Sequence, residues 1–73
     1  MRLAWVVVNE NLVRGYWRQA ALPVATIRRS RWQGGFPWRF LVEVEGQRLD
    51  SFHSLESAQL AAERAYAASR KRS

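Results

Sequence analysis

The residues that could carry acid–base or nucleophilic chemistry are few in this sequence. His53 is the only histidine, and cysteine is absent. A catalytic nucleophile needs a base within hydrogen-bond reach. His53 follows Phe52 and precedes Ser54, which is the expected junction between a strand and a helix, and a polar surface residue is typical of that position. We therefore expect a protein that is not an enzyme.

Carboxylates and glycines form no recognised site either. Glu43 and Glu45 are two residues apart on one expected strand, so they share a face, where carboxylates are usually solvated. A metal site would need further His or Cys ligands or an Asp-rich loop. Gly34-Gly35 lacks the flanking residues of a phosphate-binding loop. The sequence predicts no metal, no cofactor and no small-molecule substrate.

Positive charge is the strongest feature of the composition. Twelve Lys and Arg face six Asp and Glu, for a net charge of +6. Eleven of these twelve cations are Arg, the side chain suited to bidentate contacts with phosphate or carboxylate. Residues 1–31 carry a net +5, residues 32–69 a net −2 and residues 70–72 a net +3. Such charge can serve solubility alone, but its uneven distribution favours a polyanion or protein partner.

Cations and aromatic residues alternate in one segment. Arg28, Arg29, Arg31 and Trp32 precede a glycine loop, and Trp38-Arg39 follows it. Sheet-based nucleic-acid readers combine stacking surfaces and phosphate contacts in this way. The alternative is that the tryptophans belong to the core, which we expect for Trp38 and leave open for Trp32.

The expected elements form one small domain over residues 1–73, with 70–73 as a basic tail. Leu3 to Val8 predicts a strand that is too short for a signal sequence or a membrane span, so a cytoplasmic location is expected. Leu12 to Trp17 is expected to pair back, with Gly15 marking a bulge or a close approach. Val24 to Arg29 predicts a further strand.

The second half of the chain has the clearest periodicity. Residues 38–44 alternate apolar and polar side chains, residues 45–47 predict a tight turn, and residues 48–52 predict the return strand. Ser54 is an expected N-cap, and a stripe of mostly alanine follows at helical spacing. We expect an α+β fold: an antiparallel sheet of three to four strands with one C-terminal helix packed across one face, leaving the other face open.

From Thr26 to Arg72, about two thirds of the chain, this layout resembles two DNA-binding domains. They are those of plant ethylene-response factors and of phage integrase arms. The segments that carry the resemblance are IRRSRW, WRFLVEVEG and SFHSLESAQLAAERAYAA. In those families the open sheet face enters the DNA major groove. The resemblance implies DNA contacts from Arg28, Arg29, Arg31, Trp32, Arg39 and Arg48.

One departure from that pattern favours a protein partner. Arg39, Glu43 and Glu45 are expected on one face, where two carboxylates would oppose the binding of phosphate. In size and surface character the chain is similar to small bacteriophage regulators that dock on host RNA polymerase. We expect a regulatory protein that docks on the transcription apparatus, with direct DNA or RNA binding as the alternative. The candidate contact residues are Trp5, Val7, Arg28, Arg29, Arg31, Trp32, Arg39, Glu43, Glu45, Arg48, Arg70, Lys71 and Arg72.

Overall fold

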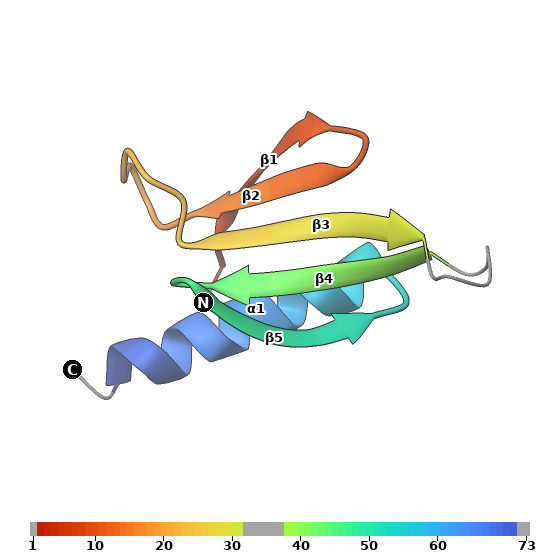
Figure 1. Ribbon diagram of the computed structural model, residues 1–73. Coiled ribbons are helices and arrows are strands. Elements are labelled where there is room, and N and C mark those ends of the chain that lie inside the picture. Colours follow the sequence, from red (N-terminus) through yellow and green to blue (C-terminus); the bar gives the residue numbers. More distant parts are fainter. Residues whose placement is uncertain (1, 32–37, 72–73) are drawn as a thin grey trace.

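A five-stranded antiparallel sheet followed by one helix forms the fold in the computed structural model, which describes residues 2–31 and 38–71 (Figure 1). The elements are β1 (Ala4–Asn9), β2 (Leu12–Tyr16), β3 (Ala25–Arg31), β4 (Trp38–Val44), β5 (Gln47–Phe52) and α1 (Leu55–Lys71). The strands lie in the sheet in the same order as in the chain. The predicted α+β class is confirmed. The sheet has five strands because the N-terminal hairpin β1–β2 extends it at the β3 edge.

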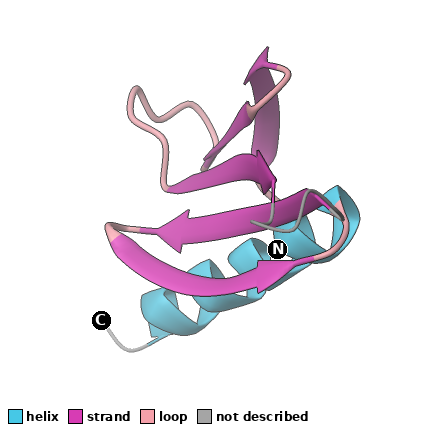
Figure 2. Cartoon of the chain, turned by 45° about the vertical axis from the view of Figure 1, so that its right-hand side comes forward, coloured by secondary structure: helices cyan, strands magenta, loops and turns pink. Residues whose placement is uncertain are grey.

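The helix divides the sheet into a covered and an uncovered side. α1 packs across β3, β4 and β5 on one side only (Figure 2). Cross-strand partners share a side, so the pairs Ile27–Val42 and Ala25–Val44 lie together beneath the helix. The residues between them, such as Thr26 and its partner Glu43, point to the other side. We call that uncovered side the open face.

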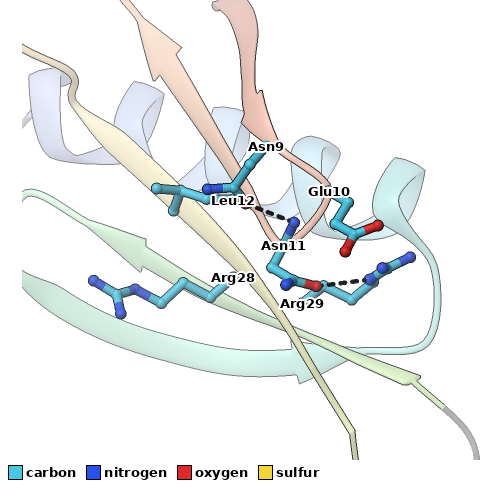
Figure 3. A pocket seen from close by; sticks show the side chains of 6 residues that line it. All are labelled: Asn9, Glu10, Asn11, Leu12, Arg28 and Arg29. Carbon is cyan, nitrogen blue, oxygen red and sulfur yellow. Dashed lines mark hydrogen bonds between the residues drawn. The ribbon is translucent and has the colours of Figure 1, made fainter.

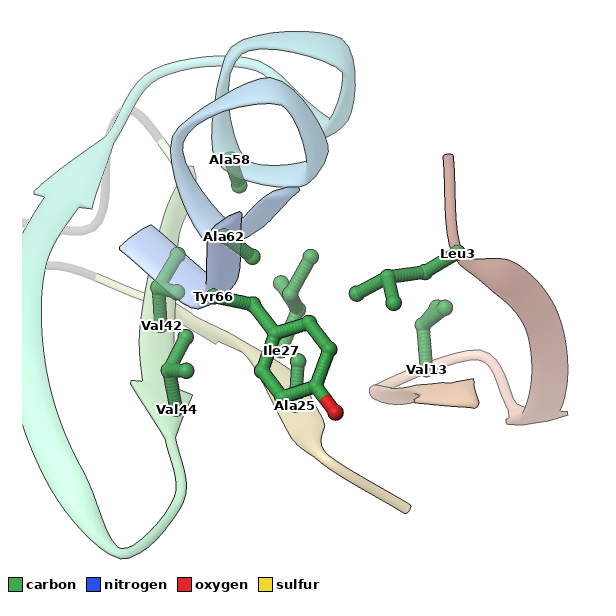
Figure 4. Close-up of a cluster of buried hydrophobic side chains, with 9 residues drawn as sticks. All are labelled: Leu3, Val13, Ala25, Ile27, Val42, Val44, Ala58, Ala62 and Tyr66. Atoms are coloured by element: carbon green, nitrogen blue, oxygen red, sulfur yellow. The ribbon is translucent and has the colours of Figure 1, made fainter. Parts of the chain in front are cut away.

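Small side chains on α1 set how closely it lies on the sheet. Ala58 and Ala62 are fully buried, and Ile27 and Val42 fill the space opposite them (Figure 4). Tyr66 extends this cluster toward the C-terminal end of the helix. The predicted alanine stripe is therefore confirmed as the packing face.

The predicted start of the helix is also confirmed. The Ser54 hydroxyl accepts a hydrogen bond from the Ser57 backbone N–H at 3.2 Å, and the Ser54 carbonyl accepts one from Ala58 N–H at 3.1 Å. The first contact satisfies an N–H group that a helix N-terminus otherwise leaves unpaired, and the second is the first backbone hydrogen bond of the helix. Glu56 lies in the first turn, where its charge suits the helix dipole.

Two long-range contacts attach the hairpin β1–β2 to the helix. One carboxylate oxygen of Glu63 accepts hydrogen bonds from the Leu3 backbone N–H at 2.8 Å and from the Trp5 indole N–H at 3.1 Å. The Trp5 ring lies against Gly15, its cross-strand partner. A Cβ at position 15 would lie 2.7 Å from Trp5 Cζ3, so glycine is needed there. The predicted close approach at Gly15 is thus confirmed.

Candidate functional site

The outer strand of the sheet exposes a run of valines. β1 pairs only with β2 within the described sheet, and Val6, Val7 and Val8 are 49%, 69% and 45% exposed. The hairpin β1–β2 extends from the part of the sheet on which α1 packs, β3 to β5 (Figure 1). We call Val6, Val7 and Val8 the valine edge. It presents apolar surface on a strand with a free side, a combination that favours contact with another chain.

The hydrogen bonds of β2 show which backbone groups of β1 face outward. The Asn11 carbonyl accepts from Arg29 N–H and the Gly15 carbonyl accepts from Val24 N–H, both at 2.9 Å. Because backbone groups alternate along a strand, Leu12, Arg14 and Tyr16 direct theirs toward β1. Val6 pairs with Arg14, so the backbone N–H and C=O groups of Val6 point toward β2. The backbone groups of its neighbours Trp5 and Val7 point to the outer edge of the sheet.

An apolar groove adjoins the valine edge on the side of the helix. It has a volume of about 220 Å³, and its apolar lining residues are Val7, Leu12, Val13, Ile27, Phe40 and Leu55. Leu55, the first residue of α1, closes one side of the groove, and Glu10 and Arg29 add charged groups to its lining. Of the two predicted contact residues on β1, Val7 is therefore placed at an accessible surface. Trp5 is half-buried, and its ring and indole N–H are engaged by Gly15 and Glu63.

A second candidate surface is the open face. The register places Arg28 opposite Leu41, Arg39 opposite Ser30, and Arg48 opposite Glu43. Arg14, which is not among the predicted contact residues, is opposite Thr26 and lies on the same face. The position of Arg14 on this face follows from the register of β2 against β3, which the sequence of β2 alone does not reveal. Four guanidinium groups from four strands thus share this side: Arg14, Arg28, Arg39 and Arg48.

Arg28, Arg29 and Arg31, which the resemblance implies as DNA contacts, do not lie on one face of the sheet. Consecutive strand residues point to opposite sides, so Arg28 lies on the open face and Arg29 on the side of the helix (Figure 3). The guanidinium carbons of Arg29 and Arg31 lie 4.3 and 5.1 Å from the Trp38 ring centroid. Arg29 also donates a hydrogen bond from Nε to Asn11 Oδ1 at 3.4 Å.

The expectation that Trp38 belongs to the core is also wrong. Trp38 is the first residue of β4 and is 38% exposed, and it is not part of the buried cluster. Its ring instead serves as a platform for the two arginines opposite and near it. Trp32, the other tryptophan of this segment, lies outside the described residues.

The two predicted carboxylates are separated. Glu43 lies on the open face beside Arg28 and Arg48. Glu45 has a φ angle of 50° and is followed by Gly46 at 83°, which gives the predicted tight turn between β4 and β5. The turn directs Glu45 toward the helix, where its carboxylate accepts a hydrogen bond from the Ser69 hydroxyl at 2.8 Å. The prediction that Glu43 and Glu45 share one face is therefore wrong.

The C-terminal cations differ in their surroundings. The Arg70 guanidinium lies 4.9 Å from the Trp17 ring centroid and donates to the Tyr66 hydroxyl at 3.5 Å. Arg18 approaches the same Trp17 ring at 4.8 Å. Arg70 therefore helps to hold the end of α1 against the segment after β2. Lys71 is exposed at the last position of the helix, and Arg72 lies outside the described residues.

Within residues 2–31 and 38–71, no group of three or more His, Cys, Asp or Glu side chains is placed to hold a metal ion. Over the same residues, no helix is long and apolar enough to cross a membrane. His53 is exposed in the bend before α1. No protein-family model, curated protein or solved structure matches the chain.

Proposed function

We propose that this chain is a small non-catalytic regulatory protein that docks on a nucleic-acid-processing machine through its valine edge. In kind it resembles bacteriophage regulators that bind host RNA polymerase in the host cytoplasm, and RNA polymerase is the partner we propose. The observation that carries the proposal is the exposure of Val6, Val7 and Val8 on β1, which pairs on one side only among residues 2–31 and 38–71.

The energetics of the valine edge support a protein partner. Burying an exposed valine side chain contributes about 1.5–3 kcal/mol at most, so a few such residues can anchor an interface. The outward backbone groups of Trp5 and Val7 can in addition pair with an extended segment of the partner. The adjoining groove of about 220 Å³ offers room for one apolar side chain from that partner.

The charge of the chain supports a partner that works on nucleic acid. The phosphates of a nucleic acid held by such a machine attract positively charged proteins, and complementary potentials raise association rates. A net charge of +6 on 73 residues suits such a location. The alternative, a DNA-binding module that uses all six residues implied by the resemblance, loses support because Arg29 and Arg31 point away from the open face.

The test measures binding of the full chain to purified bacterial RNA polymerase. We expect Val7→Glu to weaken binding by about tenfold or more, because an interfacial charge without a partner is strongly unfavourable. Leu22→Glu is the matched control, since Leu22 is 77% exposed and lies outside the hairpin. Circular dichroism checks that both variants remain folded.

Two results would contradict the proposal in different ways. Equal binding by Val7→Glu and the parent would exclude the valine edge as the docking surface. Absence of binding by the parent would exclude RNA polymerase as the partner. In that case a photo-crosslinking residue at position 7, compared with one at position 22, decides in cell extract whether the hairpin contacts any protein.

A further inference from the structure

We infer that the open face is a second binding surface, which takes the phosphodiester backbone of a nucleic acid without regard to base sequence. This inference concerns a different surface and a different class of ligand from the proposed docking. It does not depend on the partner of the valine edge. Its basis is the set of guanidinium groups that the register brings together.

The arrangement of the cations suits a chain of phosphates. Arg14, Arg28 and Arg48 are exposed and come from β2, β3 and β5. Neighbouring strands lie about 4.8 Å apart, so these side chains extend over a strip roughly three strand spacings wide. Flexible arginines across such a strip can each reach a separate phosphate. Arg39 is half-buried between them, and its Nη1 donates to the Ser51 hydroxyl at 3.0 Å.

The acidic residues reduce the charge of this face less than the sequence implied. Glu45 is turned toward α1 and bonded to Ser69, so it does not oppose a phosphate at the open face. Glu43 remains, opposite Arg48 and near Arg28. Glu10, in the turn between β1 and β2, also lines a pocket with Arg28. The four arginines that share this face therefore outnumber the two carboxylates near them.

The surface between the cations explains why we infer backbone contacts and not base recognition. Leu41 and Thr26 lie among the arginines, on a side of the sheet from which no described helix projects. The tryptophans that the structure describes are engaged elsewhere: Trp5 against Gly15, Trp17 against Tyr66 and Trp38 against Arg29. Phosphate contacts without stacking platforms or groove-reading elements give affinity but little sequence selectivity.

The test measures fluorescence anisotropy of labelled oligonucleotides with the full chain over a range of salt concentrations. Single-stranded RNA and duplex DNA of about 20 nucleotides, each in two unrelated sequences, distinguish the two sources of phosphate. We expect binding that weakens steeply with salt and is alike for both sequences of a type. Comparison of the affinities for RNA and for DNA then shows which of the two backbones the open face binds more tightly.

Two double variants make the test specific for one side of the sheet. Arg28→Gln with Arg48→Gln removes two charges from the open face, and Arg29→Gln with Arg31→Gln removes two from the opposite side. The first pair should weaken binding by about tenfold or more at low salt, and reduce the salt slope by roughly one for each phosphate-contacting arginine. The second pair should change affinity by less than about threefold. Glu43→Gln should strengthen binding.

Several results would overturn the inference. Equal losses from the two pairs would mean that only total charge matters. Absence of binding by the folded parent would exclude the nucleic-acid surface, and clear preference for one sequence would exclude backbone recognition. Stronger competition by polyglutamate than by an oligonucleotide of equal charge would assign the face to an acidic protein. Docking is tested separately by measuring the binding of the Arg28→Gln, Arg48→Gln variant to RNA polymerase freed of nucleic acid. This variant should bind the polymerase as tightly as the parent does.

Discussion

At the scale of single residues, the contact between Trp5 and Gly15 joins the outer strand to the sheet. The indole covers the glycine on one side and donates to Glu63 on the helix. Tryptophan is large enough to span both contacts, and glycine leaves the space for it. A residue selected from the sequence as a binding candidate is therefore explained by packing.

Substitution of Gly15 tests this contact. Gly15→Ala should destabilise the fold by about 1–3 kcal/mol, because the new methyl group would overlap the indole ring and force Trp5 away from Glu63. Urea denaturation followed by circular dichroism measures the change. Trp5→Leu removes the ring, so Gly15→Ala should cost much less in that background. Equal costs in both backgrounds would show that the ring does not limit the space at position 15.

At the scale of elements, the helix depends on the size of its buried alanines. Ala62→Leu should destabilise the protein by about 1–3 kcal/mol, because Ala62 is fully buried against the sheet. Ala68→Leu is the matched control on the same helix, since Ala68 is exposed. Thermal melts of the two variants make the comparison. If Ala62→Leu melts with the parent, α1 does not lie as close to the sheet as described.

The elements with strong local signals could be predicted from the sequence. Alternation over residues 38–44, the Ser54 cap and the alanine stripe each depend on neighbours within a few residues, and all three are confirmed. The joining of the hairpin to the sheet depends on pairing between β2 and β3, for which the sequence has only short and irregular patterns. The number of strands was therefore underestimated.

The composition of the candidate site was less predictable for the same reason. Arg28 and Arg29 are adjacent in sequence, so the sequence indicates one cluster of charges. Consecutive residues of a strand point to opposite sides of the sheet, so the two arginines belong to two separate clusters. Arg14 joins the open face only through cross-strand register. Glu45 left it because two residues with positive φ form the turn and change the direction of the chain after Val44.

At the scale of the whole molecule, the two proposed surfaces are adjacent without coinciding. Val6 pairs with Arg14, so the valine edge borders the open face at this pair. Val7 points to the opposite side, toward the groove beside α1. A partner that holds β1 by its outer edge would leave Arg28 and Arg48 accessible. Docking and phosphate binding can therefore occur together, with the partner setting which way the cations face.

The order of the strands also has a kinetic consequence. Each strand pairs with its neighbour in the chain, so loop closures between strands are short and the sheet can form rapidly. The Leu3–Glu63 hydrogen bond joins residues 60 positions apart. Of the contacts described above, this hydrogen bond closes the longest loop and so has the largest entropic cost of closure. We expect the hydrogen bond to form after the rate-limiting step of folding.

Stopped-flow measurements of Glu63→Ala examine this order of events. The substitution should accelerate unfolding severalfold and leave the folding rate nearly unchanged, because the lost contacts are absent from the transition state. Ala62→Leu, at the centre of the helix–sheet contact, supplies a comparison within the core. A slower folding rate for Glu63→Ala would mean that the chain ends meet early. With the expected result, the valine edge is the first part of the protein to detach and the last to return.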